Sequence, residues 1–208
     1  MIEVSTIAMT ADSRRSRRSA SRARSTSRKE ISMDAKLRPV HEADIPVLEA
    51  GASTPEGLGD LQWFGFRTFH RMRERVAQDG CLGPDDGALV VESAGAIAGW
   101  VTWSKHAWGP EATSWNWTIG IILFPEFRGR GIGTAAQKEL IEYLFAHTRV
   151  ERIQASTDVR NLAEQRALEK AGFQQEGTLR RAQWRMGKWH DQVLYAVLRE
   201  ETGLDGML

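Results

Sequence analysis

The chain has 208 residues, of which 41% are hydrophobic and 26% charged, and its formal net charge at pH 7 is +1. These values are typical of a globular domain that buries a core, and the absence of any apolar stretch of about 18 residues excludes a membrane-spanning helix. The single cysteine, Cys81, cannot form an internal disulfide, which is typical of a reducing, cytoplasmic compartment. No catalytic-cysteine signature surrounds Cys81, so we expect a structural role for it.

The charge is unevenly distributed along the chain. Residues 1–30 carry eight Lys and Arg against three Asp and Glu, a net charge of +5, so the remainder carries −4. This Ser/Arg-rich segment lacks apolar periodicity, which predicts a disordered tail over residues 1–33. An electrostatic arm for nucleic acid is one interpretation of its arginines. We favour the other, an extension upstream of an internal start at Met33, because no aromatic or base-reading element accompanies the charges.

The hydrophobic pattern predicts an ordered domain over residues 34–202 and a C-terminal tail over residues 203–208. Its first half is expected to hold a strand at 37–40, a helix starting at 42–46, a Gly/Thr/Pro-rich loop at 51–59, a helix over 61–78, strands at 87–92 and 96–103, and a strand at 114–124. Its second half is expected to hold a helix over 132–147, a strand at 152–157, a helix over 162–170, and strands near 174–181 and 192–198. This order is typical of an α+β (mixed α/β) domain around one sheet.

The most informative segment connects the apolar strand at 114–124 to the helix at 132–147. It alternates glycines with arginines: Arg128, Gly129, Arg130, Gly131 and Gly133. Glycines let successive backbone N–H groups converge on an anion, and the positive end of the following helix points to the same place. The segment therefore predicts a loop that binds a pyrophosphate.

Other phosphate-binding motifs do not fit this spacing. A Walker A loop needs a lysine before its hydroxyl residue, whereas Thr134 directly follows Gly133. The dinucleotide fingerprint needs G-x-G-x-x-G, whereas residues 129–133 read G-x-G-x-G. The remaining alternative is a glycine-rich connection between strand and helix that binds no ligand. The combination of three glycines and two arginines at a helix start disfavours it.

Residues 128–133 resemble the coenzyme A motif of the GNAT superfamily of N-acetyltransferases, Arg/Gln-x-x-Gly-x-Gly/Ala. Downstream, Asn161 begins a helix that ends in Leu-Glu-Lys-Ala-Gly-Phe at 168–173. This pattern is similar to the branch of ribosomal-protein N-terminal acetyltransferases of the RimJ/RimL type, as is the closing segment at 187–195. The resemblance covers about residues 36–201.

The resemblance implies a GNAT-type acyl-CoA N-acyltransferase fold, with helices flanking a central, mostly antiparallel sheet that contains a splayed pair of strands. It implies acetyl-CoA as the co-substrate, with its pantetheine arm along the splayed strand and its pyrophosphate on the glycine loop. The residues implied to bind it are Ile121, Ile122, Leu123, Arg128, Gly129, Arg130, Gly131, Ile132, Gly133, Thr134 and Asn161. Asn161 also suits a plain helix N-cap.

The sequence departs from the family at both customary acid–base positions. The tyrosine often found seven residues after the asparagine is Leu168, and the glutamate often found two residues before the glycine of the splayed strand is Thr118. The catalytic residues are therefore unknown, and the candidates are His106, Ser156, Asp158 and His190. We expect no metal site.

Tryptophans are concentrated around the strands at 96–103 and 114–124. Trp115 and Trp117 alternate and are expected to share a face, whereas Trp100 and Trp103 are expected to point to opposite faces. An aromatic acceptor pocket and ordinary core packing both explain this pattern.

We expect the chain to transfer an acetyl group from acetyl-CoA to a primary amine by direct attack. The acceptor is either a protein N-terminus or a small-molecule amine such as an antibiotic or amino-acid derivative. Both alternatives stay open, because the segments expected to contact the acceptor, residues 53–80 and 104–114, carry no motif that distinguishes them. A non-catalytic acyl-CoA-binding module is the alternative, and nucleic-acid binding through the tail is a third, less favoured interpretation. A monomer or homodimer with no membrane partner is expected.

Overall fold

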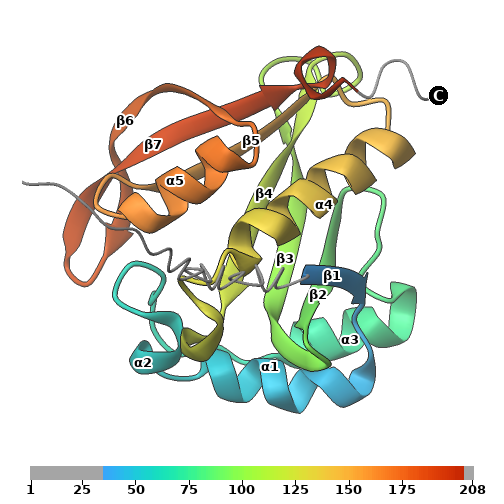
Figure 1. Ribbon diagram of the computed structural model, residues 1–208, viewed down its shortest axis with the longest axis vertical. Coiled ribbons are helices and arrows are strands. Elements are labelled where there is room, and N and C mark those ends of the chain that lie inside the picture. The colour runs from blue at the N-terminus through green and yellow to red at the C-terminus, as the bar shows by residue number, and fades with distance from the viewer. Residues whose placement is uncertain (1–34, 204–208) are drawn as a thin grey trace, which may run out of the picture. The chain divides into compact units, whose positions relative to one another are not determined.

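The computed structural model describes residues 35–203, whose seven strands form one sheet in the order β1-β2-β3-β4-β5-β7-β6 (Figure 1). The strands are β1 (Ala35–Pro39), β2 (Asp86–Ser93), β3 (Ala96–Ala107), β4 (Trp115–Leu123), β5 (Arg152–Asp158), β6 (Gln174–Arg185) and β7 (Lys188–Leu198). All neighbours are antiparallel except β4 and β5, which confirms the mostly antiparallel α+β class. The expected tail over residues 1–33 and residues 204–208 lie outside the described residues.

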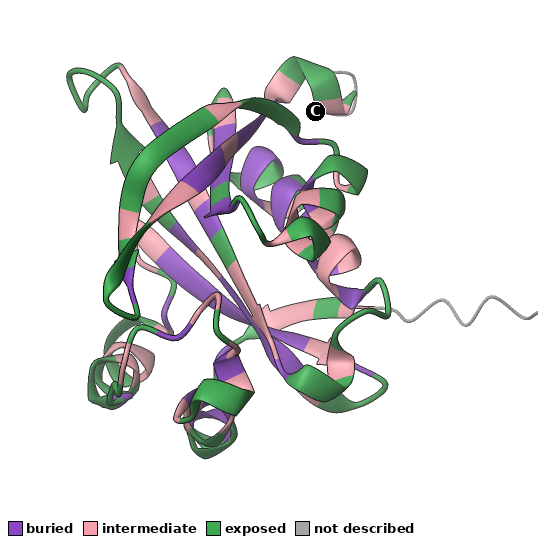
Figure 2. Cartoon of the chain, turned by 90° about the vertical axis from the view of Figure 1, so that its left-hand side faces the viewer, coloured by how far each residue is buried: buried purple, intermediate pink, exposed green. Residues whose placement is uncertain are grey.

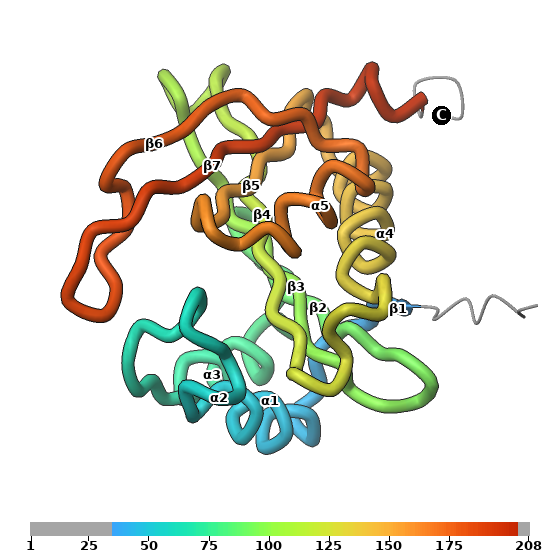
Figure 3. Tube along the Cα trace, turned by 60° about the vertical axis from the view of Figure 1, so that its left-hand side comes forward, coloured from blue at the N-terminus to red at the C-terminus, as the bar shows by residue number. Residues whose placement is uncertain are grey.

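Helices cover both faces of the sheet (Figures 1 and 3). One face carries α4 (Ile132–His147) and α5 (Leu162–Lys170), and the other carries α1 (Ile45–Ala52), α2 (Pro55–Leu58) and α3 (His70–Asp79). Short 3-10 helices occupy Glu42–Asp44, Pro125–Phe127 and Arg199–Thr202. Within residues 35–203 no helix is both long and apolar enough to cross a membrane. The same range holds no group of three or more His, Cys, Asp or Glu side chains that could hold a metal ion.

The alternation of side chains along the central strands produces two separate cores. On β2, Leu89 and Val91 belong to the larger core with the inner side of α4, whereas Ala88 and Val90 belong to the smaller core with α1. Figure 2 shows the buried residues concentrated along these strands. The central strands are therefore buried on both faces, which holds them in fixed positions.

The tryptophans of β3 and β4 pack in or against these cores. Trp103 and Trp117 lie in the larger core and Trp100 in the smaller one, which confirms that Trp100 and Trp103 point to opposite faces. The rings of Trp115 and Trp117 meet edge to face with centroids 5.0 Å apart, as expected for residues that share a face. Trp100 also lines a cavity described below, so core packing and cavity lining both involve this residue.

The parallel pair β4 and β5 is splayed. The two strands pair over only two positions, Trp117 with Ile153 and Thr118 with Gln154. Beyond Thr118, β4 continues to Leu123 while pairing with β3 alone, and Figure 1 shows β4 and β5 diverging. The edge of β4 from residue 119 to 123 therefore has no neighbouring strand on the β5 side.

The helix expected over residues 61–78 is wrong in its first half, because α3 begins only at His70. The apolar residues before it recur at near-helical spacing, but Gly65 has φ +99° and interrupts any helix there. Trp63 and Phe69 are instead buried in the smaller core, which fixes this stretch as an irregular segment. We call residues 59–69 the 59–69 loop.

The loop expected at 51–59 is also partly wrong, because it contains the end of α1 and all of α2. The Thr54 side chain accepts a hydrogen bond from the Gly57 N–H at 3.1 Å, and Pro55 occupies the first helical position. Thr and Pro are favoured at helix starts, but they are also common in loops. The Gly/Thr/Pro composition of residues 51–59 therefore favoured a loop.

The closing hairpin of β6 and β7 is longer than expected, because each strand extends four residues closer to the turn. Figure 3 shows this turn reaching toward the side of the molecule that carries α2 and α3. The Arg185 guanidinium carbon lies 5.8 Å from the centre of the Phe64 ring. The hairpin and the 59–69 loop therefore meet above the splayed edge of β4.

Candidate coenzyme and acceptor site

The glycine loop has the backbone geometry of an anion cradle. Gly129 and Gly131 have φ +70° and +82°, and a Cβ at either position would have no heavy atom within 4 Å. Gly131 directly precedes α4, whose first N–H groups have no intrahelical partners. Left-handed residues followed by a helix start direct successive N–H groups into one concave space, which suits a pyrophosphate.

The loop residues implied by the resemblance do not all face this space. Gly129, Gly131, Gly133 and Thr134 line it, whereas Ile132 is fully buried in the larger core and offers only its backbone N–H. Arg130 is exposed and is not among the lining residues. The Arg128 guanidinium lines it but donates to the carbonyl oxygens of Leu123 at 2.8 Å and Leu58 at 3.3 Å. Arg128 therefore also ties β4 to α2.

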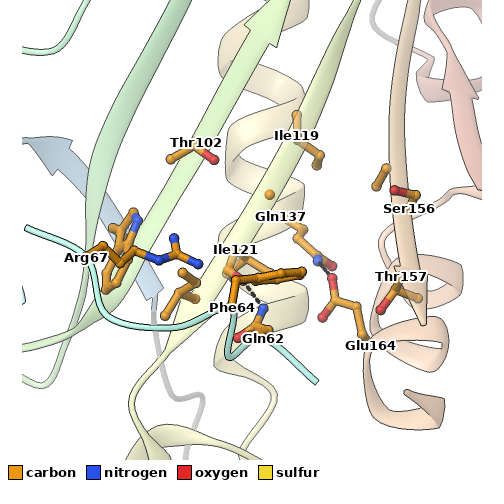
Figure 4. A pocket seen from close by; sticks show the side chains of 14 residues that line it. Gln62, Phe64, Arg67, Thr102, Ile119, Ile121, Gln137, Ser156, Thr157 and Glu164 are labelled. Carbon is orange, nitrogen blue, oxygen red and sulfur yellow. Dashed lines mark hydrogen bonds between the residues drawn. The ribbon is translucent and has the colours of Figure 1, made fainter. Parts of the chain in front are cut away.

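Two cavities meet at the splayed edge of β4. The loop cavity, about 550 Å³, extends from the glycine loop along α5 and is lined by residues including Asp60, Asn161, Arg166 and Lys170. The sheet cavity, about 230 Å³, lies between β4 and β5 and is lined by residues including Phe64, Arg67, Trp100, Gln137 and Ser156 (Figure 4). Both are lined by Gln62, Ile121 and Glu164, so these three residues mark their junction.

The free edge of β4 is partly covered by side chains. The Gln62 amide nitrogen donates to the Ile121 carbonyl oxygen at 2.9 Å, as the dashed line in Figure 4 shows. Leu123 lines the loop cavity, and Ile122 lines the sheet cavity. The three strand residues implied to meet a pantetheine arm are thus all at the cavities, with Gln62 on the carbonyl oxygen of the first of them, Ile121.

Asn161 is the N-cap of α5. Its side-chain oxygen accepts from the Glu164 N–H at 3.3 Å, and its amide nitrogen donates to the Thr157 hydroxyl at 3.0 Å. The N-cap interpretation is therefore confirmed, and Asn161 also lines the loop cavity. These bonds fix the first turn of α5 against β5.

Glu164 is a site residue that the sequence reasoning missed. It follows Asn161 by three positions, and its carboxylate accepts a hydrogen bond from the Gln137 amide nitrogen. Burial raises the pKa of the Glu164 carboxyl to about 7, although the bond from Gln137 acts in the opposite direction. An acidic residue three positions after an N-cap is common at helix starts, so only the fold distinguishes this one.

The four catalytic candidates have different surroundings. Ser156 lines the sheet cavity, whereas His106 is exposed at the far end of β3 and packs against Trp108 with ring centroids 4.9 Å apart. Asp158 is buried in a charged cluster with Arg160, Arg185 and His190. Burial opposes ionisation of Asp158, but hydrogen bonds from Arg160 and Arg185 outweigh it and hold the pKa of that carboxyl below its usual range. An ionised, fully paired Asp158 is a poor proton acceptor.

The two positions at which the sequence departs from the family have structural roles. Leu168 is fully buried in the larger core. The Thr118 hydroxyl accepts from the Gln154 amide nitrogen at 2.9 Å, at the last paired position of β4 and β5. Neither residue provides a group that titrates near neutral pH.

Cys81 is buried, and burial raises the pKa of its thiol although Arg75 acts against this. It lies in the smaller core and lines neither cavity. A protonated thiol is a weak nucleophile.

Cys81→Ala should therefore change the rate of acetyl transfer by less than about twofold, because the loss of a small buried group affects stability rather than the site. Steady-state rates and an acetylated Cys81 peptide sought by mass spectrometry test this. Ping-pong kinetics together with that peptide would contradict direct transfer.

Comparison with known proteins gives the family. The family model described as an acetyltransferase (GNAT) domain matches residues 35–174. The chain belongs to the GNAT acetyltransferase family. A probable N-acetyltransferase of Bacillus subtilis, YjcK, is 37% identical to this GNAT chain over 83 residues, which are 40% of the chain and 46% of that relative. The chain spans about half the length of the curated relatives it matches.

Solved structures share the fold of this GNAT chain. Spermidine N-acetyltransferase from Vibrio cholerae, solved with CoA and spermine, matches with a TM-score of 0.68 and 18% identity, covering 81% of this chain and 97% of that one. RimJ from Mycobacterium smegmatis, solved with CoA-disulfide, matches with a TM-score of 0.66 and 22% identity, covering 81% and 84%. The expected GNAT fold is confirmed, and the expected enzyme class and acetyl-CoA co-substrate are those of the family.

Proposed function

We propose that the chain transfers an acetyl group from acetyl-CoA to a primary amine. The observation that carries this proposal is the meeting of two cavities at the free edge of β4, with Gln62, Ile121 and Glu164 common to both. A two-substrate transfer needs separate sites whose reacting ends converge, because positioning of the two reactants supplies much of the rate. A module that only bound the coenzyme would not need the second cavity.

The loop cavity fits coenzyme A. Its glycine cradle offers backbone N–H groups to a pyrophosphate, and Arg128, Arg166 and Lys170 give the same cavity a positive balance. The free edge of β4 offers its backbone to a pantetheine arm in the manner of an added strand. Acetyl-CoA supplies the activated thioester, and the residues of the chain hold it and orient the acceptor against it.

The sheet cavity supports an acceptor that carries a negative charge. Arg67 and Glu164 are its charged lining residues, and the Arg67 guanidinium carbon lies 5.9 Å from the centre of the Phe64 ring. Arginine and an aromatic ring favour a carboxylate on a small, partly apolar body. Amino-acid derivatives and short peptides with a free N-terminus have this chemistry, whereas a polyamine would place a further cation near Arg67.

Release of free thiol from acetyl-CoA with a panel of amines tests the function. We expect an N-terminal peptide or amino-acid derivative to be acetylated more efficiently than spermidine or kanamycin.

Arg67→Gln should raise the KM for the preferred acceptor about tenfold, which matches the loss of one charge-assisted hydrogen bond of about 1.4 kcal/mol. The control is Arg71→Gln, since Arg71 is exposed on α3 and lines neither cavity. Tight acetyl-CoA binding without turnover of any amine would instead establish a non-catalytic binding module.

A further inference from the structure

We propose that Glu164 carries the proton of this reaction, from the acceptor amine to the sulfur of the leaving coenzyme A thiolate. The inference rests on the proposed function and assigns a catalytic residue that the sequence does not.

The position of Glu164 is unusual among the acidic residues at the site. It lines both the loop cavity and the sheet cavity, whereas Asp60 lines only the loop cavity. Figure 4 shows the Glu164 side chain beside Gln137, across the gap between β4 and β5 from Ile121. A group at this junction can reach the nitrogen of an acceptor in one cavity and the sulfur of a coenzyme in the other.

The Glu164 carboxylate has one hydrogen-bond partner among the described residues, the Gln137 side chain. Gln137 is 1% exposed; its amide nitrogen donates to Glu164, while its own side-chain oxygen has no hydrogen-bond partner among the described residues. An orphaned buried acceptor costs stability unless a ligand satisfies it. Gln137 also lines the sheet cavity, so one unpaired acceptor lies directly beside the carboxyl group at this site.

The charged groups around the two cavities do not neutralise Glu164. They are Asp60 and Arg67 on the 59–69 loop, Arg128 before α4, and Arg166 and Lys170 on α5. Burial is the main influence on its pKa, which rises to about 7, and no cation within residues 35–203 contributes to the shift. Near neutral pH the carboxyl group therefore exists in both protonation states, as a group that first accepts and then donates a proton must.

Glu164 alone can accept and return the one proton that this transfer moves. The lone pair of the amine forms the bond to the acetyl carbonyl carbon, and the carbon–sulfur bond breaks with its electron pair remaining on sulfur. The proton leaves the nitrogen for the Glu164 carboxylate and passes from the resulting carboxylic acid to the thiolate. The products are the amide and free coenzyme A, and Glu164 returns to its ionised state.

A structural role for Glu164 does not account for these observations. Acidic residues in the first turn of a helix stabilise it when they are ionised and exposed. Glu164 is instead half-buried with a raised pKa, so its ionisation destabilises the folded state as pH rises from about 4.5, the usual value, to about 7. A residue kept at a cost to stability in a cavity is a candidate for function.

The test compares Glu164→Gln and Glu164→Asp with the wild-type protein. Glutamine keeps the size of the side chain but cannot titrate, and aspartate keeps a carboxyl group at shorter reach. Glu142→Gln is the control, because Glu142 is exposed on α4 and lines neither cavity. We expect Glu164→Gln to lower the single-turnover rate about 100-fold, which is typical for the loss of an acid–base group. The Kd for acetyl-CoA should change less than threefold.

The pH dependence separates catalysis from structure. The wild-type rate should show a step with a midpoint near 7 that Glu164→Gln lacks, and Glu164→Asp should restore part of the rate. Independently of activity, Glu164→Gln should raise the melting temperature at pH 8 and leave it unchanged at pH 4. A wild-type protein that acetylates amines, with a Glu164→Gln variant of equal rate and unchanged pH profile, would overturn this inference alone. A wild-type protein that binds acetyl-CoA but acetylates no amine would overturn the proposed function and this inference with it.

Discussion

Gly133→Glu should lower the affinity for acetyl-CoA at least 1000-fold while the protein remains folded. Gly133 lies in the first turn of α4, and a Cβ there would meet Leu123 Cδ1 at 3.4 Å and Ile121 Cδ1 at 4.0 Å, which are ordinary contacts. The new carboxylate would lie where the pyrophosphate is proposed to bind. Two unit charges about 4 Å apart repel by about 4 kcal/mol at an effective dielectric constant near 20, which corresponds to roughly three decades in Kd.

Titration calorimetry with acetyl-CoA measures this effect, and circular dichroism confirms that the variant is folded. Gly133→Ala is the matched control, because it adds the same Cβ without charge and should weaken binding less than tenfold. Gly131→Glu is a poorer choice, since Gly131 has φ +82° and any side chain there strains the backbone. A folded Gly133→Glu variant with wild-type affinity would show that the glycine loop does not hold the pyrophosphate.

Arg185→Met should destabilise the protein by about 3–5 kcal/mol, because it leaves the buried carboxylate of Asp158 without its buried partner. Both side chains are 1% exposed, and the Arg185 guanidinium donates directly to Asp158. Arg160 donates to the same carboxylate at 3.1 Å, but its own side chain is 59% exposed and cannot shield the charge fully. Urea denaturation at pH 7 measures the loss in the free energy of unfolding.

The pH dependence of stability provides the second measurement for this cluster. The folded-state pKa of Asp158 is lowered, so its contribution is present above about pH 4 and is lost as pH falls further. Arg185→Met should reduce this acid-dependent loss. The double variant Arg185→Met/Asp158→Asn should recover much of the stability at pH 7, because it removes the unpaired charge. A single variant as stable as the wild-type protein would mean that Arg160 and His190 suffice for Asp158.

The sequence predicted the parts of this fold that depend on local pattern. The helices at 132–147 and 162–170 have the observed bounds, because each shows a sustained apolar face and ends at a recognisable cap or stop. The helix prediction was wrong over residues 61–69, because apolar residues at near-helical spacing can also be buried by an irregular segment. Trp63 and Phe69 are buried by packing on the smaller core, which is a long-range contact that no local window contains.

The same distinction applies to the site. The glycine loop was predictable because its chemistry lies within one contiguous motif. Glu164 was not, because its environment depends on Gln137 from α4 and on the separation of β4 from β5, both distant in the chain. Asp158 was among the catalytic candidates, but only the fold reveals that Arg185, contributed by the closing hairpin, engages it.

The free edge of β4 has a consequence for the protein without its ligand. An unpaired strand edge is a template on which another chain can add a strand and start aggregation. Here Gln62 donates to the Ile121 carbonyl oxygen and Arg128 to that of Leu123, so two of the exposed acceptors are already satisfied from within the chain. A ligand that extends along this edge therefore meets Gln62 at the Ile121 carbonyl oxygen. In the protein without a ligand, the Gln62 and Arg128 side chains occupy the edge to which a strand of another chain would add.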